Sequence, residues 1–157
     1  MGPGLPSREV EGEADASKLK ITVVCARWNP TITDGLLASA LRSLAERGAK
    51  PSRVTVIRVP GAFELAAGAR LALADARCDA VVALGAVVRG ETTHHEILGH
   101  AVGTALAQLS AETGRPVGFG LLTCDTMDQA RARLEKGAEA AEAAVEMANL
   151  RRRLAKR

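Results

Sequence analysis

Short apolar runs rich in β-branched residues constrain the fold of this chain more than any other feature. The longest, Ala80–Val88, is apolar throughout apart from Gly85. A run of this length without polar alternation indicates a strand that is buried on both faces. Comparable runs, each expected to form a strand, lie at Leu19–Cys25, Val54–Val59 and Val117–Leu122.

The segments between these runs have helical patterns. Thr33–Arg47 places its leucines on one helical face, and Gly48 follows where a left-handed C-terminal cap is favoured. Further helices are expected at Phe63–Asp75, at His95–Thr113, at Met127–Glu135 and from residue 138 to the C-terminus. Strands that alternate with helices predict right-handed crossovers and a parallel sheet covered on both sides. The fold class is therefore α/β, with about four parallel strands.

Length and composition predict one globular domain. The 157 residues are 47% hydrophobic and 25% charged, which is enough to build a core. Residues 1–17 are rich in Gly, Pro, Glu and Ser, so we expect a flexible N-terminal arm before a single domain at 18–157. Aromatic residues make up only 2% of the chain, so small side chains must fill the interior. Such a core buries little area per residue, which favours association with other subunits.

Several functional classes are disfavoured. The three cysteines lack the spacing of a zinc site or a disulfide framework, which favours a reducing, cytoplasmic setting. The N-terminus has no apolar core typical of a signal peptide, and no run reaches the ~18 apolar residues that span a membrane. The net charge of +3 comes from cations at the C-terminus, which we interpret as a solvated helix end rather than a nucleic-acid arm: Arg151, Arg152, Arg153, Lys156 and Arg157.

Ligands of open α/β sheets bind beyond the carboxyl ends of the strands. Four turns are expected to meet there, and they contain the only Trp, one of the two Phe and two of the three His. In a chain so poor in aromatic residues, this concentration indicates a binding site. The four turns are Cys25–Asn29, Val59–Glu64, Val88–Glu96 and Thr123–Thr126.

The turn around Gly90 has the features of an anion site. It precedes an expected helix, whose first backbone N–H groups are free and partially positive. Thr92 and Thr93 add hydroxyl groups, and the same residues are also compatible with an ordinary cap in which Thr93 is the N-cap and Glu96 the third helical residue. His94 is a candidate for proton transfer or a plain surface residue.

Other motifs leave the chemistry open. No nucleotide-binding glycine loop and no serine nucleophile motif is present. The cations Arg131, Arg133 and Lys136 either supply charge to a phosphate or form a solvated helix face. His95 and His100 are spaced poorly for a shared metal ion.

Six segments in order give the chain a close resemblance to the lumazine synthase family, from about Leu19 to Leu150. The most specific are Val59–Glu64 and Asp79–Gly90 followed by Thr92–His94. The other three are Ala26–Asn29, Gly118–Thr123 and Glu146–Leu150.

The resemblance implies a fold, a reaction and an assembly. The fold is a flavodoxin-like, three-layer αβα arrangement with a parallel four-stranded sheet. The reaction condenses 5-amino-6-(D-ribitylamino)uracil with 3,4-dihydroxy-2-butanone 4-phosphate, in the penultimate step of riboflavin biosynthesis. It needs no metal or organic cofactor. Members form homopentamers, some of which pack as twelve into a hollow shell, and riboflavin synthase is a further candidate partner. A non-catalytic, shell-forming or lumazine-binding homologue is the alternative, although that class tolerates loss of His94 or Arg133, which are both present.

The resemblance also assigns roles to individual residues. His94 is implied to transfer protons. Glu91 and Thr92 are implied to bind phosphate through their amides, together with Arg133 from a neighbouring subunit. The pyrimidine and its ribityl chain are implied to contact Trp28, Ala62, Phe63, Glu64, Ala86, Val87, Val88 and, from the neighbour, Phe119.

Four features depart from the family pattern. The segment between Arg133 and Lys136 is short, which leaves the role of Lys136 open. Glu91 places a carboxylate near a phosphate site, which is unfavourable unless it points to solvent. His95 stands where the family often has an aromatic residue. Residues 1–17 are poorly suited to the strand that commonly pairs with a neighbour's sheet.

Overall fold

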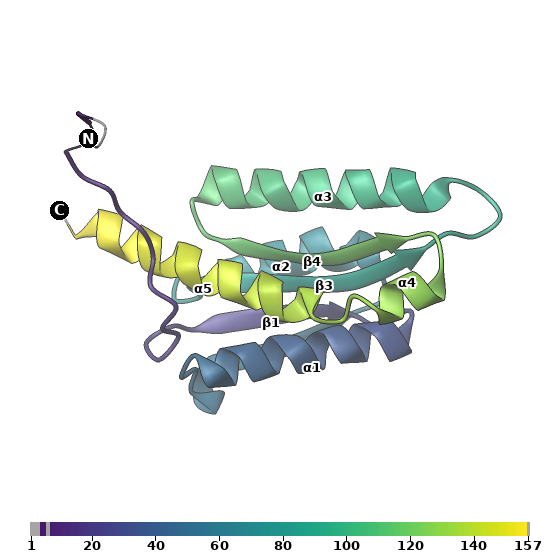
Figure 1. The fold of residues 1–157 in the computed structure, drawn as a ribbon, viewed down its shortest axis with the longest axis horizontal. Coiled ribbons are helices and arrows are strands. Elements are labelled where there is room, and N and C mark those ends of the chain that lie inside the picture. Colours follow the sequence, from purple (N-terminus) through teal and green to yellow (C-terminus); the bar gives the residue numbers. More distant parts are fainter. Residues whose placement is uncertain (1–3, 6, 157) are drawn as a thin grey trace.

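The computed structural model describes residues 4–5 and 7–156. A parallel sheet of four strands in the order β2-β1-β3-β4 lies at its centre (Figure 1). This is the strand order of the flavodoxin-like fold, in which the chain winds first to one side of β1 and then to the other. The strands are β1 (Ile21–Ala26), β2 (Val54–Val59), β3 (Ala80–Val88) and β4 (Val117–Cys124).

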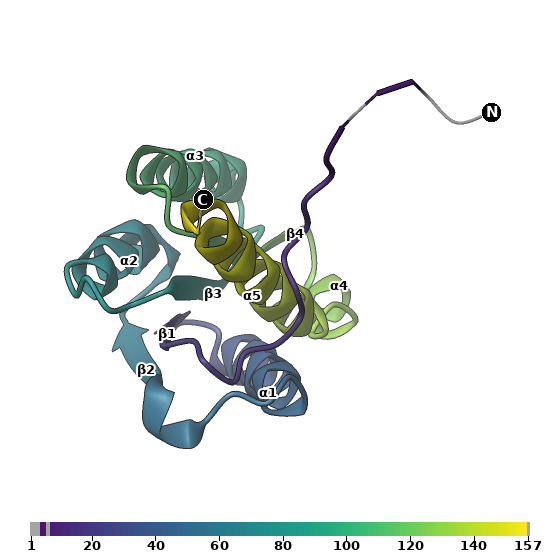
Figure 2. The same ribbon diagram turned by 90° about the vertical axis from the view of Figure 1, so that its left-hand side faces the viewer.

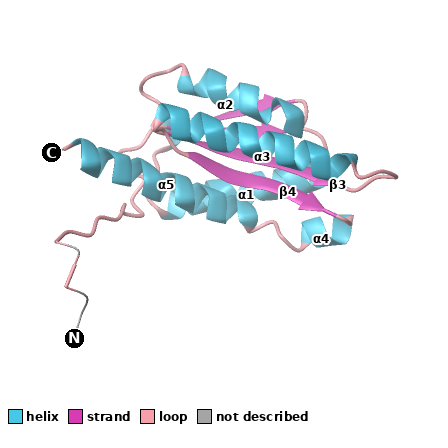
Figure 3. Cartoon of the chain, turned by 90° about the horizontal axis from the view of Figure 1, so that it is seen from above, coloured by secondary structure: helices cyan, strands magenta, loops and turns pink. Residues whose placement is uncertain are grey.

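Helices cover both faces of the sheet and make three layers. One face carries α1 (Pro30–Glu46) and α5 (Lys136–Ala155), and the other carries α2 (Leu65–Leu73) and α3 (His94–Thr113), as Figures 2 and 3 show. The short α4 (Met127–Arg131) follows β4. Each face has its own core of aliphatic side chains, in which β1 and β3 point successive residues to opposite sides. The sequence-based fold class is confirmed.

Element boundaries differ from the expected ones by a few residues. The expected helix at Phe63–Asp75 begins as a 3₁₀ turn at Ala62–Glu64 and becomes α-helical at Leu65. β4 continues beyond Leu122 to Cys124, where it still pairs with the end of β3. The expected helix at Met127–Glu135 ends at Arg131. Gly48 and Gly114 follow helices with φ of 85° and 66°, as expected for left-handed caps.

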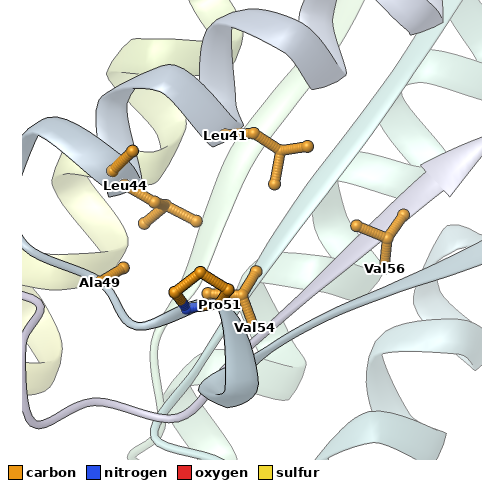
Figure 4. Close-up of a pocket in the computed structure, with 7 residues that line it drawn as sticks. Leu41, Leu44, Ala49, Pro51, Val54 and Val56 are labelled. Carbon is orange, nitrogen blue, oxygen red and sulfur yellow. The ribbon is translucent and has the colours of Figure 1, made fainter.

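The expectation that every strand is covered on both faces is wrong for β2. None of its residues is buried, because β2 is an edge strand and the helices of both faces pack mainly against β1, β3 and β4. Beside this edge lies an apolar pocket of about 320 Å³ between α1 and β2 (Figure 4). Its lining consists of Leu41, Leu44, Ala45, Ala49, Pro51, Val54 and Val56.

The described part of the N-terminal arm crosses α5 near its C-terminal end (Figures 1 and 2). Asn149 on α5 donates its side-chain amide to the carbonyls of Glu13 and Asp15, at 2.7 and 2.8 Å. Arg153 donates to the carbonyl of Glu11 at 3.0 Å. Residues 1–3 and 6 of the expected arm lie outside the described residues. Its flexibility stays a prediction.

Two other expectations concern charge and membranes. Within the described C-terminal cluster, Arg152 pairs with Asp79 at 3.0 Å and so binds the protein itself, while Arg157 lies outside the described residues. No helix in the described part of the chain is long and apolar enough to cross a membrane.

The cysteines Cys25, Cys78 and Cys124 are all buried and unpaired.

Candidate functional site

The topology places a switch point at the carboxyl ends of β1 and β3. After β1 the chain turns to α1 on one face, and after β3 it turns to α3 on the opposite face. The two strands are neighbours, so their following loops diverge to opposite faces, and we call the region between these loops the crevice. In folds of this type such a switch point is where ligands bind.

Asn29 ties the two strand ends together. It lies in the left-handed region, with φ 61° and ψ 56°, directly before Pro30 begins α1. Its side-chain amide donates to the carbonyl of Ala86 at 3.0 Å. An asparagine tolerates this backbone conformation better than most residues. Sequence reasoning gave Asn29 no role of its own, although an Asn-Pro pair at a helix start is a recognisable signal.

The predicted pyrimidine residue Trp28 lies against the second turn of the site. Its amide donates to the carbonyl of Pro60 at 3.1 Å, which extends the pairing of β1 with β2 beyond the strands. A Cβ atom added to Gly61 would lie 2.6 Å from Cε3 of Trp28, so only glycine allows the indole to come this close. The indole is nonetheless 67% exposed, which leaves its outer face open for stacking.

The turn Ala62–Glu64 stands beside this indole. Glu64 accepts the amide of Gly61 at 3.0 Å through one carboxylate oxygen, which closes the 3₁₀ turn. Ala62 is buried, whereas the ring of Phe63 is 69% exposed. Two aromatic rings and one carboxylate are thus presented at the same edge of the sheet.

The end of β3 forms the floor of the crevice. Ala86 and Val87 are buried and Val88 is partly buried, so their side chains are occupied in the core. What remains for a ligand in this segment is backbone polarity. Within one chain, the structure therefore brings together the sequence-predicted residues Trp28, Ala62, Phe63, Glu64, Ala86, Val87 and Val88.

The predicted phosphate residues lie in the exposed loop before α3. Glu91, Thr92, Thr93 and His94 are all exposed, so the carboxylate of Glu91 is free to point into solvent. Thr93 is the N-cap, but its side chain makes no capping hydrogen bond, so the predicted capping box is absent. Instead the hydroxyl of Thr92 accepts the amide of His94 at 3.3 Å.

Two backbone donors stay available at this helix start. Within residues 4–5 and 7–156, the amides of Glu91 and Thr92 make no hydrogen bond. They lie at the positive end of α3, a helix of 20 residues. Free amides at such an end form a ready site for an anion.

The predicted residue Phe119 stands apart from this crevice in the same chain. Phe119 pairs with Ala83, five positions before the end of β3 at Val88, or roughly 16 Å along the strand at about 3.3 Å per residue. Its ring is 44% exposed on the α3 side of the sheet, close to Gly103. Arg133 is exposed after α4 and donates to the carbonyl of Gln129 at 2.7 Å.

Arg133 also acts on the end of β4. Burial raises the pKa of the Cys124 thiol, and the positive charge of Arg133 opposes that effect. The guanidinium of Arg133 therefore lies close enough to Cys124, the last residue of β4, to lower the pKa of its thiol. Lys136, whose role the sequence leaves open, pairs with Glu139 at 3.3 Å on the first turn of α5.

Sequence reasoning gave no role to His95, and the structure places it differently from its neighbour. Its side chain is 4% exposed, and Nε2 lies 3.6 Å from Oδ1 of Asp125. No group of three or more His, Cys, Asp or Glu in the described part of the chain is placed to hold a metal ion. The site is thus made of aromatic faces, backbone groups and single charged side chains.

The family of the chain follows from comparison with known proteins. The family model for 6,7-dimethyl-8-ribityllumazine synthase matches residues 18–152. The chain belongs to the lumazine synthase family. That match includes all of the turns that form the crevice and also Phe119 and Arg133.

Individual lumazine synthases agree with this assignment along almost their full length. The 6,7-dimethyl-8-ribityllumazine synthase of Clavibacter sepedonicus is 51% identical over 157 residues, covering 95% of this chain and 94% of its own. That of Kocuria rhizophila is 49% identical and covers 94% of this chain and 96% of its own. That of Thermotoga maritima is 41% identical, with coverages of 92% and 91%.

Proposed function

We propose that the crevice at the ends of β1 and β3 is the active site of this lumazine synthase. There 5-amino-6-(D-ribitylamino)uracil is condensed with 3,4-dihydroxy-2-butanone 4-phosphate, which yields 6,7-dimethyl-8-ribityllumazine and releases phosphate and water. The observation that carries the proposal is the indole of Trp28, which lies against Gly61 with its outer face exposed beside the buried end of β3.

The pyrimidine fits the part of the site that is built around this indole. A flat heterocycle stacks on Trp28, with a gain of about 1–3 kcal/mol by analogy with bases on aromatic residues. Its ring atoms meet the backbone groups of Ala86, Val87 and Val88. The ribityl chain extends toward Ala62, Phe63 and Glu64, where Glu64 keeps one carboxylate oxygen outside its bond to Gly61.

The ketone phosphate fits the start of α3. Its phosphate accepts hydrogen bonds from the amides of Glu91 and Thr92, favoured by the positive end of the helix. The pyrimidine amine attacks the ketone to give an imine with loss of water, phosphate is then eliminated, and the ribityl-bearing amine closes the ring on the remaining carbonyl with loss of a second water. His94, exposed beside the phosphate loop, moves protons in these steps. Most of the acceleration comes from holding two substrates together.

The site is completed by a second copy of the chain, in a homopentamer. Phe119 is distant from the crevice of its own chain, and both Phe119 and Arg133 reach the crevice of a neighbour. All three aromatic side chains, Trp28, Phe63 and Phe119, are exposed in the single chain, although aromatic rings are usually covered. The exposed edge strand β2 and the apolar pocket beside it provide further contact surface for a neighbouring subunit.

Further proposals concern the setting of the enzyme. The three free cysteines fit the reducing cytoplasm. Riboflavin synthase, which consumes the lumazine product, is the proposed protein partner, and packing of twelve pentamers into a shell is the proposed larger assembly. Residues 11–15 of the arm are held against the C-terminal half of α5 by Asn149 and Arg153.

The test combines a condensation assay with light scattering. Purified protein mixed with both substrates is expected to release phosphate and to form the lumazine in equal amounts, and light scattering is expected to report five subunits or a multiple of five. A protein that binds the lumazine but releases no phosphate is the non-catalytic alternative. No observation favours that alternative, because His94 and Arg133 are both present and exposed.

A further inference from the structure

His95 is the anchor of the segment that carries the proposed phosphate site. From Arg89 to Ala101 it is the only buried residue. The next buried residues of α3 are Val102 and Leu106, on the same face of the helix. At their helical end, the exposed loop and His94 are thus attached to the body of the protein first through His95, with the partly buried Leu98 packing three residues further on.

The two ring nitrogens of His95 have unequal surroundings. Nε2 faces Oδ1 of Asp125 at 3.6 Å, whereas Nδ1 is buried and has no hydrogen-bond partner among residues 4–5 and 7–156. A buried nitrogen without a partner is unfavourable. A phenyl ring would fill nearly the same space without that cost. The presence of an imidazole is therefore explained by its polar contact with Asp125.

Asp125 stands where three segments meet. It follows β4 directly, and its amide donates to the side chain of Gln129 on α4 at 2.8 Å. Its carboxylate lies 4.0 Å from the guanidinium of Arg89, whose own amide donates to the carbonyl of Cys124 at 2.9 Å. The end of β4, the start of the phosphate loop and the first turn of α3 therefore all approach one carboxylate.

α3 and β4 also touch directly beside this contact. A Cβ atom added to Gly99, one turn after His95, would lie 2.7 Å from the hydroxyl of Thr123. The first turns of α3 are therefore packed closely against the last residues of β4.

We propose that His95 is a positioning residue for the phosphate site, acting through Asp125. Nε2–H donates to the carboxylate of Asp125 and fixes the first turn of α3, and this sets where the amides of Glu91 and Thr92 point. The separation of 3.6 Å exceeds a normal hydrogen bond, and a small rotation of the exposed carboxylate closes it. The inference rests on the proposed phosphate site.

The first test separates the polar contact of His95 from its packing. His95→Phe keeps the ring and removes the donor, whereas His95→Gln keeps a donor near the position of Nε2. For His95→Phe we expect the KM for the ketone phosphate to rise about tenfold, as for one lost hydrogen bond to a charged group, with an unchanged KM for the pyrimidine. His95→Gln should remain within about twofold of the wild-type enzyme.

The second test uses Asp125, whose exposure makes its replacement safe for folding. Asp125→Ala removes both the charge and the acceptor oxygen, and if Asp125 acted only as a negative charge this variant would tighten phosphate binding. Positioning predicts the opposite, a rise in the ketone phosphate KM similar to that of His95→Phe. The double variant should be no worse than either single one, as for two residues in one contact.

Three results would overturn the inference. They are a wild-type KM for the ketone phosphate in Asp125→Ala, a KM in His95→Gln as high as that in His95→Phe, or an equal loss for both substrates. If His95→Phe does not fold, Asp125→Ala alone decides. An inactive wild-type protein would instead refute the proposed function, so the two failures are distinguishable.

Discussion

The two halves of the crevice are built in different ways. The pyrimidine half is packed and held by its own chain: Asn29 bonds Ala86, and the indole of Trp28 lies against Gly61. The phosphate half is an exposed loop with free amides, anchored by one buried histidine. The first half is formed before any ligand arrives. The second depends on a helix end, a neighbour and the ligand, and it should therefore be the half where single substitutions affect catalysis most.

The largest effect is expected for His94→Ala, which removes the proton-transfer group from the exposed half. Turnover should fall about a hundredfold, at the low end for acid–base groups, because imine formation also proceeds slowly without a catalyst. Steady-state rates with both substrates measure it. His100→Ala is the matched control, since it removes another exposed histidine of α3. Wild-type turnover in the His94 variant would exclude a role in proton transfer.

Arg133→Ala tests whether the phosphate half is completed by another chain. The KM for the ketone phosphate should rise roughly tenfold to a hundredfold, the loss expected for a charge-assisted hydrogen bond, while the pyrimidine KM stays the same. Arg131→Ala is the control, because that exposed arginine lies two residues earlier, at the end of α4, and pairs with Asp128.

Mixed pentamers sharpen the same test. His94→Ala and Arg133→Ala chains, unfolded together and refolded at equal amounts, should regain activity in about a quarter of the sites if each site joins two chains around a ring. No recovery in oligomers shown by mass spectrometry to be mixed would mean that each site belongs to one chain.

The packed half was easier to predict from sequence than the exposed half. Apolar runs predicted all four strands, and glycines predicted the ends of two helices, because burial and backbone conformation are local signals. The sequence predicted that the turns of Trp28 and Gly61 lie together, because parallel strands end at one edge of the sheet. It did not predict the contact of His95 with Asp125, because these side chains are 30 positions apart and their orientation depends on packing. The exposed edge at β2 was missed for a similar reason, since an apolar run does not show which strand lies outermost.

Asn29→Ala tests how firmly the packed half is built. The variant loses the bond to Ala86 and puts a Cβ-bearing residue without local polar support at φ 61°. The free energy of unfolding should fall by about 1–3 kcal/mol. Asn29→Gly also removes the hydrogen bond, but glycine adopts a positive φ without strain, so its free energy of unfolding should fall by only about 1 kcal/mol. Urea unfolding measures both. Equal losses in the two variants would show that backbone strain plays no part at this position.

The smallest effect is spectroscopic, and it reports the packed half directly. Trp28 is the only Trp and the chain has no Tyr, so nearly all intrinsic emission arises from this residue. Its indole is 67% exposed in the single chain, and a pyrimidine stacked on it should quench the emission saturably and shift its maximum. Titration with a non-reactive ribityl-pyrimidine measures this, and the ketone phosphate alone should change the spectrum much less, because it binds the other half.

Two glycine variants show whether that signal depends on the position of the indole. Gly61→Ala puts a methyl group 2.6 Å from Cε3 of Trp28, so the indole must move and the pyrimidine should both bind and quench less. Gly90→Ala lies in the phosphate loop with nothing within 4 Å of its added methyl group, and it should leave the pyrimidine titration unchanged. If calorimetry shows a saturated pyrimidine site while the wild-type spectrum stays constant, Trp28 is not in contact with the ligand. In that case its place against Gly61 serves only to pack the turn after β2, and the pyrimidine must be held by Phe63 and the end of β3 alone.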